Sequence, residues 1–335
     1  MGSRGSPLEL VLNALYFSDE RPGSIAFETV DSLRATGLVD PIPLHVKHHS
    51  QGVPIIGTTL DYLDHRGLRV AQGRQIARLG DAVIGAGAAS RLGVGVGDSI
   101  LSSPESVFDI AGVYPLKMPV VGVLAPGLGA DDDAIFVDLR TAWIIDGIGH
   151  GHQELTRPEA AGAVLKTEGE RIVANASLVQ YNEITDDNLE SFHFHGSNAG
   201  YPITATIPVP RSDKGRVLLL GRYQSHPELQ MLEPARVIDQ LLETVFAVQD
   251  YLLIAMGLVG AATAAVVVLV FLLSWRARRA EQVTLHRLGG SRRTIRALML
   301  SEVVLVLLAA GLLAAILVVL TQWYGGPLIK AVLLA

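Results

Sequence analysis

The stretch Leu252–Leu273 reads LLIAMGLVGAATAAVVVLVFLL and carries no charged side chain. A second uncharged stretch, Val303–Thr321, follows after a basic segment. Because an α-helix rises about 1.5 Å per residue, roughly 20 apolar residues cross the hydrocarbon core of a bilayer. Helices in the core of a soluble protein are seldom this long without a polar stripe. The two stretches therefore predict two transmembrane helices, which we place at residues 251–275 and 299–323.

The segment between these two stretches is strongly basic. Only two acidic residues, Glu281 and Glu302, oppose its arginines. Because short basic loops stay on the cytoplasmic side of a membrane, the first helix is expected to run from outside to inside and the second to return. We assign residues 276–298 to a cytoplasmic coupling segment, in which a short helix over Ala280–Leu288 is expected to end at Gly289–Gly290 and Ser291 to cap the next helix. Residues 324–335 are assigned to an extracytoplasmic tail or the start of a further helix. The arginines are Arg276, Arg278, Arg279, Arg287, Arg292, Arg293 and Arg296.

This orientation places the large N-terminal part of the chain outside the membrane. The 335-residue chain has a net charge of −6, although the coupling segment, called the hinge below, is basic. The rest of the chain is therefore acidic, which argues against a nucleic-acid partner. There is no cysteine, which excludes a disulfide framework, thiol catalysis and thiol-ligated metal sites. The first 17 residues offer no apolar core of signal-peptide length, so we expect a further membrane helix upstream.

Residues 1–233 mix predicted strands and helices and predict an α+β extracytoplasmic domain with two lobes, 1–150 and a smaller, β-rich 151–233. Pro234 then opens a stalk helix over 234–250, which is expected to continue without a break into the first membrane helix. The other predicted helices include Ser24–Ala35, capped by Ser24, and the other predicted strands include 107–113, 174–179 and Val217–Tyr223. His45, His48, His49 and the acidic run Asp131–Asp133 are expected to lie at the surface.

Histidines recur in pairs in GIGHGHQE and SFHFHG, at His150 and His152 and at His193 and His195. Side chains two positions apart point to the same face of a strand, so each pair can reach one metal ion. With Glu154 or Asp187, a Zn²⁺ or Cu²⁺ site is one interpretation, and two loops with solvated histidines are the other. No Gly-x-x-x-x-Gly-Lys-Ser/Thr loop occurs, so this chain is not expected to bind nucleotide phosphates.

The hinge sequence RRAEQVTLHRLGGSRRTIRALMLSE resembles the signature of FtsX-like permeases of ABC transporters. Upstream, VIGAGAASRLGVGVGDSI and DDDAIFVDLRTAW resemble the MacB-type periplasmic core domain, and FHFHG, PITATIPVP and LLLGRY resemble a branch of permeases in that family. Such permeases have four membrane helices, so this chain resembles a fragment that lacks the first and the last. The hinge residues that carry the resemblance are Arg278, Glu281, Leu285, Leu288, Gly289, Arg292, Arg293 and Glu302.

The resemblance implies a multi-pass permease of a bacterial inner membrane, working as a homodimer or with a paralogous permease beside a separate ATPase that binds ATP and Mg²⁺. Movement of the external domain would export a lipid, peptide or drug-like substrate, or would signal to an external enzyme. The arginines of the hinge can bind lipid headgroups or acidic ATPase residues, and Glu281 is expected to contact the ATPase or to pair with Arg278. The alternative from another class is a membrane-anchored metal-binding protein or metallohydrolase built on the four histidines. The residues expected to couple to the ATPase are Glu281, Leu285, Leu288, Gly289, Arg292 and Arg293.

Overall fold

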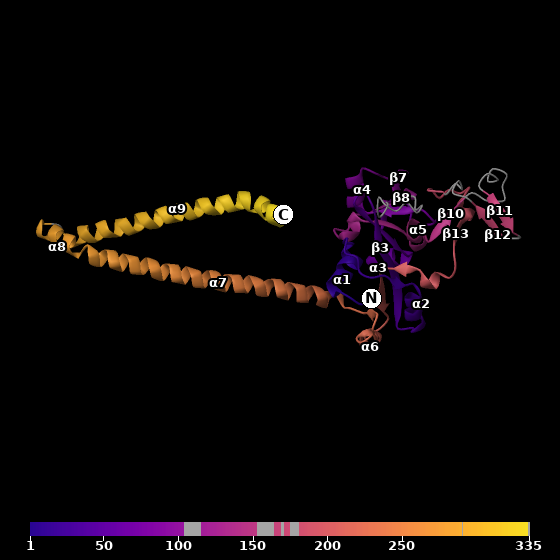
Figure 1. Cartoon of the computed structure of the whole chain (residues 1–335), viewed down its shortest axis with the longest axis horizontal. Coiled ribbons are helices and arrows are strands. Elements are labelled where there is room, and N and C mark those ends of the chain that lie inside the picture. The colour runs from indigo at the N-terminus through magenta and orange to yellow at the C-terminus, as the bar shows by residue number, and fades with distance from the viewer. Residues whose placement is uncertain (104–114, 153–163, 169–170, 175–180, 290, 334–335) are drawn as a thin grey trace. The chain divides into compact units, whose positions relative to one another are not determined.

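A computed structural model describes residues 1–103, 115–152, 164–168, 171–174, 181–289 and 291–333 of the chain. These residues form two compact units, Met1–Leu242 and Glu243–Ala335 (Figure 1). The first unit mixes strands and helices, and the second consists of long apolar helices. The mixed domain and the two long apolar helices that the sequence predicts are therefore both present.

One large mixed sheet organises the first unit, and ten strands of the described residues belong to it. Two of its neighbouring pairs, β4 with β9 and β6 with β8, run parallel, while the other pairs are antiparallel. In order across the sheet the strands are β16 (Leu229–Gln230), β1 (Gly2–Ser3), β15 (Ala205–Pro210), β3 (Val39–Ser50), β4 (Val53–Thr58), β9 (Ile135–Asp138), β6 (Ala82–Ile84), β8 (Lys117–Leu124) and β5 (Val70–Gly73), with β7 (Ser99–Leu101) on β8.

Helices cover both faces of this sheet, which explains why its central strands are apolar at successive positions. In β4, Ile55 packs into one hydrophobic core with helix α5, whereas Ile56 packs into another with α1 and α3. The neighbouring strand β9 repeats this division at Ile135 and Phe136. The helices of this unit are α1 (Pro7–Tyr16), α2 (Glu28–Ala35), α3 (Leu60–Arg66), α4 (Ala86–Leu92), α5 (Leu139–Ile145) and α6 (Asp213–Tyr223).

Two predicted elements of this unit were wrong in type or extent. Residues 24–35 do not form one helix: a short strand comes first, and α2 begins at Glu28 without a side-chain cap. The predicted strand Val217–Tyr223 lies within helix α6, whose start is capped by Ser212 through a hydrogen bond from the Gly215 amide. A short apolar run fits a buried strand or one side of a helix equally well, and here the cap decides.

The boundary expected at residue 150 cuts through one fold. Strand β15 pairs with β3, and β16 pairs with β1, so residues beyond 200 complete the central sheet. The expected strand 107–113 and residues 175–179 lie outside the described residues. Three small two-stranded sheets complete the unit: β10 (Gly149–Gly151) with β13 (Phe192–Phe194), β11 (Val164–Glu168) with β12 (Arg171–Ala174), and β14 (Pro202–Ile203) with β2 (Ile25–Ala26).

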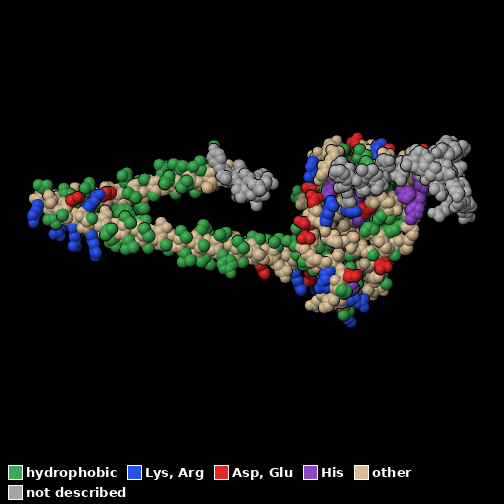
Figure 2. Space-filling view, in the orientation of Figure 1, with side chains coloured by type: hydrophobic (Ala, Val, Ile, Leu, Met, Phe, Trp, Pro, Cys, Tyr) green, Lys and Arg blue, Asp and Glu red, His purple; other side chains and the backbone are tan. Residues whose placement is uncertain are grey.

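The helical part of the chain consists of α7 (Pro234–Ala277), α8 (Arg279–Arg287) and α9 (Arg292–Leu333). The continuous helix predicted from the stalk into the first span is confirmed, since α7 runs for 44 residues without a break. At 1.5 Å per residue its length is about 66 Å. Two segments, Pro234–Ala277 and Arg292–Trp323, are long and apolar enough to cross a membrane. Apolar side chains cover both helices on the visible face (Figure 2).

Candidate functional site

The hinge between the two long helices is a short helix with a sharp turn at each end. Helix α7 ends at Ala277, and α8 begins two residues later at Arg279. After α8, Gly289 has a φ of +92°, a conformation that side-chain-bearing residues rarely adopt. Ser291 then caps α9, because its hydroxyl accepts a hydrogen bond of 3.1 Å from the Thr294 amide. The predicted helix, glycine break and serine cap of the hinge are thus all present.

Two side-chain contacts hold α8 against the start of α9. The guanidinium of Arg278 lies 2.8 Å from the Glu302 carboxylate. One turn further on, the amide of Gln282 donates to the Met299 sulfur at 3.0 Å. Arg278 therefore pairs with Glu302. It does not pair with Glu281, although a pair with Arg278 was one of the two contacts expected for Glu281. The pairing joins residues 24 positions apart in the chain and connects the start of α8 to α9.

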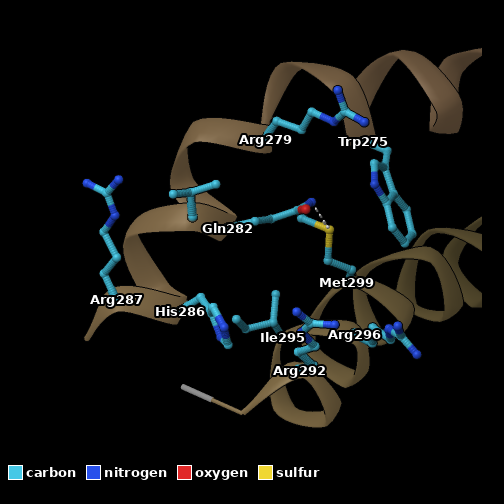
Figure 3. Close-up of a pocket in the computed structure, with 10 residues that line it drawn as sticks. Trp275, Arg279, Gln282, His286, Arg287, Arg292, Ile295, Arg296 and Met299 are labelled. Carbon is cyan, nitrogen blue, oxygen red and sulfur yellow. Dashed lines mark hydrogen bonds between the residues drawn. The ribbon is translucent and has the colours of Figure 1, made fainter. Parts of the chain in front are cut away.

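A pocket of about 660 Å³ opens between α8 and the first turns of α9. Figure 3 shows Arg279, Arg287 and Arg296 around it, with Gln282 and Met299 in contact at its centre. In the space-filling view the basic side chains of this part gather together (Figure 2). A pocket with this lining favours an anionic occupant. The full lining is Trp275, Arg279, Gln282, Val283, His286, Arg287, Arg292, Ile295, Arg296 and Met299.

The residues predicted to couple to a partner are distributed over this hinge. Leu285 and Leu288 are large apolar side chains, 42% and 80% exposed. Glu281 is also exposed on α8, and among the described residues it takes part in no ion pair. Arg292 lines the pocket, whereas Arg293 does not. Apolar residues exposed beside unpaired charges on a short helix are typical of a surface that another protein covers.

The four predicted histidines form a second constellation, in the first unit. Strands β10 and β13 pair antiparallel with Gly149 opposite Phe194, His150 opposite His193 and Gly151 opposite Phe192. Because side chains alternate along a strand, the phenylalanines point to one face and the histidines to the other. Phe192 joins the main hydrophobic core, and Phe194 packs against it. The histidines therefore gather on the outer face, where they form a patch (Figure 2).

All four imidazole rings lie close together. The ring centroids of His150 and His193 are 4.8 Å apart, and those of His193 and His195 are 4.9 Å apart. Ligand-type atoms of His150, His152 and His193 all lie within 4.8 Å of one another. Burial, followed by the charges of the three neighbouring histidines, lowers the pKa of His150 below its usual range. Both effects favour neutral imidazole, the form that binds metals.

Two other histidines are not where the sequence placed them. His45 and His48 are 1% and 3% exposed, not surface residues, because the end of α5, where Asp146 is the C-cap, packs against this part of β3. Their Nε2 atoms lie 2.8 Å and 3.0 Å from the two carboxylate oxygens of Asp146. The ammonium of Lys47 lies 2.7 Å from the same carboxylate. This trio also has metal-ligand composition, but the adjacent ammonium disfavours a cation.

Asp131 is a second correction, since it is buried rather than solvated. It lies in the 3₁₀ helix Ala130–Asp133. Its carboxylate accepts hydrogen bonds from the Tyr62 hydroxyl at 2.7 Å and from Arg66 at 2.6 Å. Asp133, in contrast, is exposed as expected and pairs with Arg91. The acidic run therefore helps to hold α3 on the sheet.

Comparison with known proteins finds a similarity for part of the first unit. Residues 16–177 match the family described as MacB-like periplasmic core domain. No curated protein sequence matches the chain. The solved extracellular domain of the noncanonic ABC-type transporter YknZ from Gram-positive bacteria is 20% identical, with a TM-score of 0.29 over 39% of this chain and 73% of that one. A domain of a putative permease protein from Porphyromonas gingivalis is 12% identical, with a TM-score of 0.28 over 65% and 86% of the two chains.

Proposed function

We propose, from the premise that this chain is a permease component of an ABC-type transporter with a MacB-like periplasmic core domain, that its hinge receives the movement of a separate ATPase. The observation that carries the proposal is the form of the hinge itself. A nine-residue helix lies between two helices of 44 and 42 residues. It carries the exposed Glu281, and the exposed Leu285 and Leu288 follow within two turns. The resemblance of the hinge sequence to FtsX-like permeases supports the same assignment.

The hinge can transmit force because it is tied to both long helices. Arg278 follows α7 directly, and its pairing with Glu302 connects the end of that helix to α9. A push on α8 therefore reaches both helices at once. The pair is half-exposed, and as a charge-assisted hydrogen bond it connects the two helices directly. Leu285 and Leu288 would enter an apolar groove of the ATPase, and Glu281 would pair with a basic residue beside it.

The unbroken α7 supports the second step, in which movement at the hinge reaches the external domain. A continuous helix resists bending, because a bend breaks backbone hydrogen bonds unless proline or a bulge accommodates it. Pro234 is at the start of α7, and no proline follows within the helix. ATP binding in a dimeric partner would thus move the external domains of two permease subunits. The chain itself would carry out no catalysis.

Two activities outside the membrane could result from this movement of the external domain. We propose extrusion of a lipid, peptide or drug-like molecule from the outer face of the inner membrane. An external enzyme activated by the same movement is the second candidate, because transmission through α7 does not depend on what the domain contacts. Neither activity requires a nucleotide site in this chain.

Co-purification with the ATPase encoded beside this chain tests the coupling hinge. The wild-type chain is expected to retain the ATPase in detergent, and Glu281→Lys is expected to lower the recovered ATPase at least about tenfold, as loss of a contact worth 1.4 kcal/mol would. Glu243→Lys is the matched control, since it makes the same charge change on an exposed residue of α7 far from the hinge. Equal recovery with all three chains would contradict the proposal.

A further inference from the structure

We propose that four histidines, one in each of the paired strands β10 and β13 and one directly after each strand, form a binding site for one transition-metal ion, of which Zn²⁺ is the best fit. The site would belong to the first unit, whereas the hinge belongs to the second, and no ATP-driven step requires it. It adds a metal-dependent property to a transporter subunit. The ligands are His150, His152, His193 and His195.

The strand pairing fixes these histidines on one face. A Cβ atom added at Gly149 would lie 2.5 Å from the Phe194 ring, and one added at Gly151 would lie 2.6 Å from the Phe192 ring. The two aromatic rings therefore occupy the space directly over the two glycines. The core contacts of the rings hold that face inward. The alternation Gly-His-Gly-His opposite Phe-His-Phe-His thus leaves the histidines only the outer face.

The spacing of the four rings suits a single small ion. In a tetrahedral site with Zn–N distances near 2.1 Å, ligand nitrogens are about 3.4 Å apart. Three of the ligand atoms already lie within 4.8 Å of one another, so rotation of side chains on a fixed backbone can close the remaining distance. The fourth ring, His195, lies with its centroid 5.1 Å from that of His150 and completes the set.

A hydrogen bond to the backbone orients the ring of His193, as is usual for the histidine ligands of metal sites. The Nδ1 atom of His193 lies 2.9 Å from the Ser191 carbonyl oxygen, so it carries the proton and donates there. The Nε2 atom of that ring is then left with its lone pair for a metal. Histidine ligands in known sites are commonly held in this way by a carbonyl group.

The chemistry of the donor set selects the ion. Four imidazoles supply only nitrogen, which suits Zn²⁺, Cu²⁺ and Ni²⁺ and not Mg²⁺ or Ca²⁺. The lack of cysteine means that no thiolate competes for the ion or is oxidised by it. The histidines are partly accessible, so the ion can enter from the external solution.

A bound ion would also stabilise the local fold. Strands β10 and β13 share three residue pairs, and so short a two-stranded ladder is marginally stable in water. An ion held from both strands would connect them, and its binding free energy would add to the stability of the ladder.

Titration of the full chain in detergent with Zn²⁺, after dialysis against a chelator, tests the site. We expect one equivalent bound with high affinity, measured by calorimetry and by metal analysis. The double variant His150→Ala/His193→Ala is expected to weaken binding at least about 100-fold, since changes outside the ligand shell alone already cost 10–100-fold. His65→Ala is the control, because His65 is exposed on α3 outside the cluster. Co²⁺ in place of Zn²⁺ gives a visible spectrum that reports four-coordinate nitrogen ligation.

Each outcome decides the question. Loss of the bound equivalent and of the Co²⁺ spectrum in the double variant, with both retained in His65→Ala, supports the site. Absence of stoichiometric binding overturns it. Binding that persists in the double variant overturns it as well, because the ion would then occupy another site such as the buried trio. Near-ultraviolet circular dichroism of the variants shows whether the domain remains folded. If the double alanine variant does not fold, the milder His150→Gln/His193→Gln variant takes its place.

Discussion

Two carboxylates, Asp131 and Asp146, are buried in the first unit, and each is a hydrogen-bonding or ion-pairing partner of several other side chains. Each accepts contacts from several groups, and neither lies in the proposed metal site or the hinge. A buried acceptor that loses its charge leaves its partners unsatisfied, which costs more than the bond itself contributed. Their replacement is therefore expected to affect stability and not coupling.

Replacing Asp131 with Asn is expected to destabilise the domain by roughly 2 kcal/mol, because Arg66 and the Tyr62 hydroxyl lose a charged acceptor. The midpoint of thermal denaturation of the full chain, followed by near-ultraviolet circular dichroism, measures this change. Asp133→Asn is the matched control. Its pair with Arg91 is exposed, so its effect should stay within about 0.5 kcal/mol. Equal effects of the two variants would show that Asp131 is not a structural anchor.

Asp146 predicts a pH dependence of stability. Burial by itself raises the pKa of this carboxyl, but the hydrogen bonds and charges of His45 and His48 outweigh it and leave the pKa below the ordinary value of 3.8. A lowered folded pKa contributes stability above the unfolded pKa, and this contribution is lost as the pH falls. The difference in denaturation midpoint between wild type and Asp146→Asn should thus be full at pH 6 and shrink below about pH 4. A difference that grows in acid would contradict this.

The sequence could not reveal these buried polar residues, because their burial depends on distant pairing. His45 and His48 look like surface residues of a polar stretch, HVKHHS. They are buried because the end of α5, with Asp146 as its C-cap, packs against this part of β3 from about 100 residues further along the chain. Asp131 likewise belongs to a run of three aspartates, and only the approach of α3 distinguishes it from Asp133. In contrast, the alternation that places His150 with His152, and His193 with His195, on one face of a strand is local, and the sequence predicted it for each pair. The pairing of β10 with β13, which brings the two pairs together, is not local.

At the scale of elements, the packing of α8 against α9 is the feature that the hinge proposal depends on. A cysteine pair at Gln282 and Met299 should react with a short bismaleimide crosslinker, because these side chains are in contact. The natural absence of cysteine gives a clean background. Mass spectrometry of tryptic peptides detects the product. The pair Glu281→Cys/Met299→Cys starts from the neighbouring residue, about 100° around the helix, and should react much less.

Should both cysteine pairs crosslink equally, α8 would not hold a fixed face toward α9, and the pairing of Arg278 with Glu302 would not be the connection we describe. The elements of this hinge were predicted well from the sequence. Gly289 and Ser291 are local signals for a helix end and a helix start, and such signals act without tertiary help. The run at Val217–Tyr223 failed because its local signal was ambiguous until the cap at Ser212 was known.

For the whole molecule, the orientation in the membrane is the central expectation. Ser32, in the first unit, and Arg287, in the hinge, are both exposed, so a single cysteine introduced at either position can react. In intact cells a membrane-impermeant maleimide should label Ser32→Cys and leave Arg287→Cys unlabelled until the cells are permeabilised. This follows from the basic hinge being retained on the cytoplasmic side. Labelling of the hinge cysteine in intact cells would contradict the orientation and with it the contact with an ATPase.

The pairing of β15 with β3 has a further consequence for how the chain is made. Residues 205–210 complete a sheet whose other central strands lie between residues 39 and 138. During synthesis one edge of the 12-residue β3 has no partner until more than 150 further residues have emerged. Non-local pairing of this kind forms slowly, and an open apolar edge invites pairing with other chains. The time between the emergence of the two strands is therefore the period in which the nascent domain most needs a chaperone.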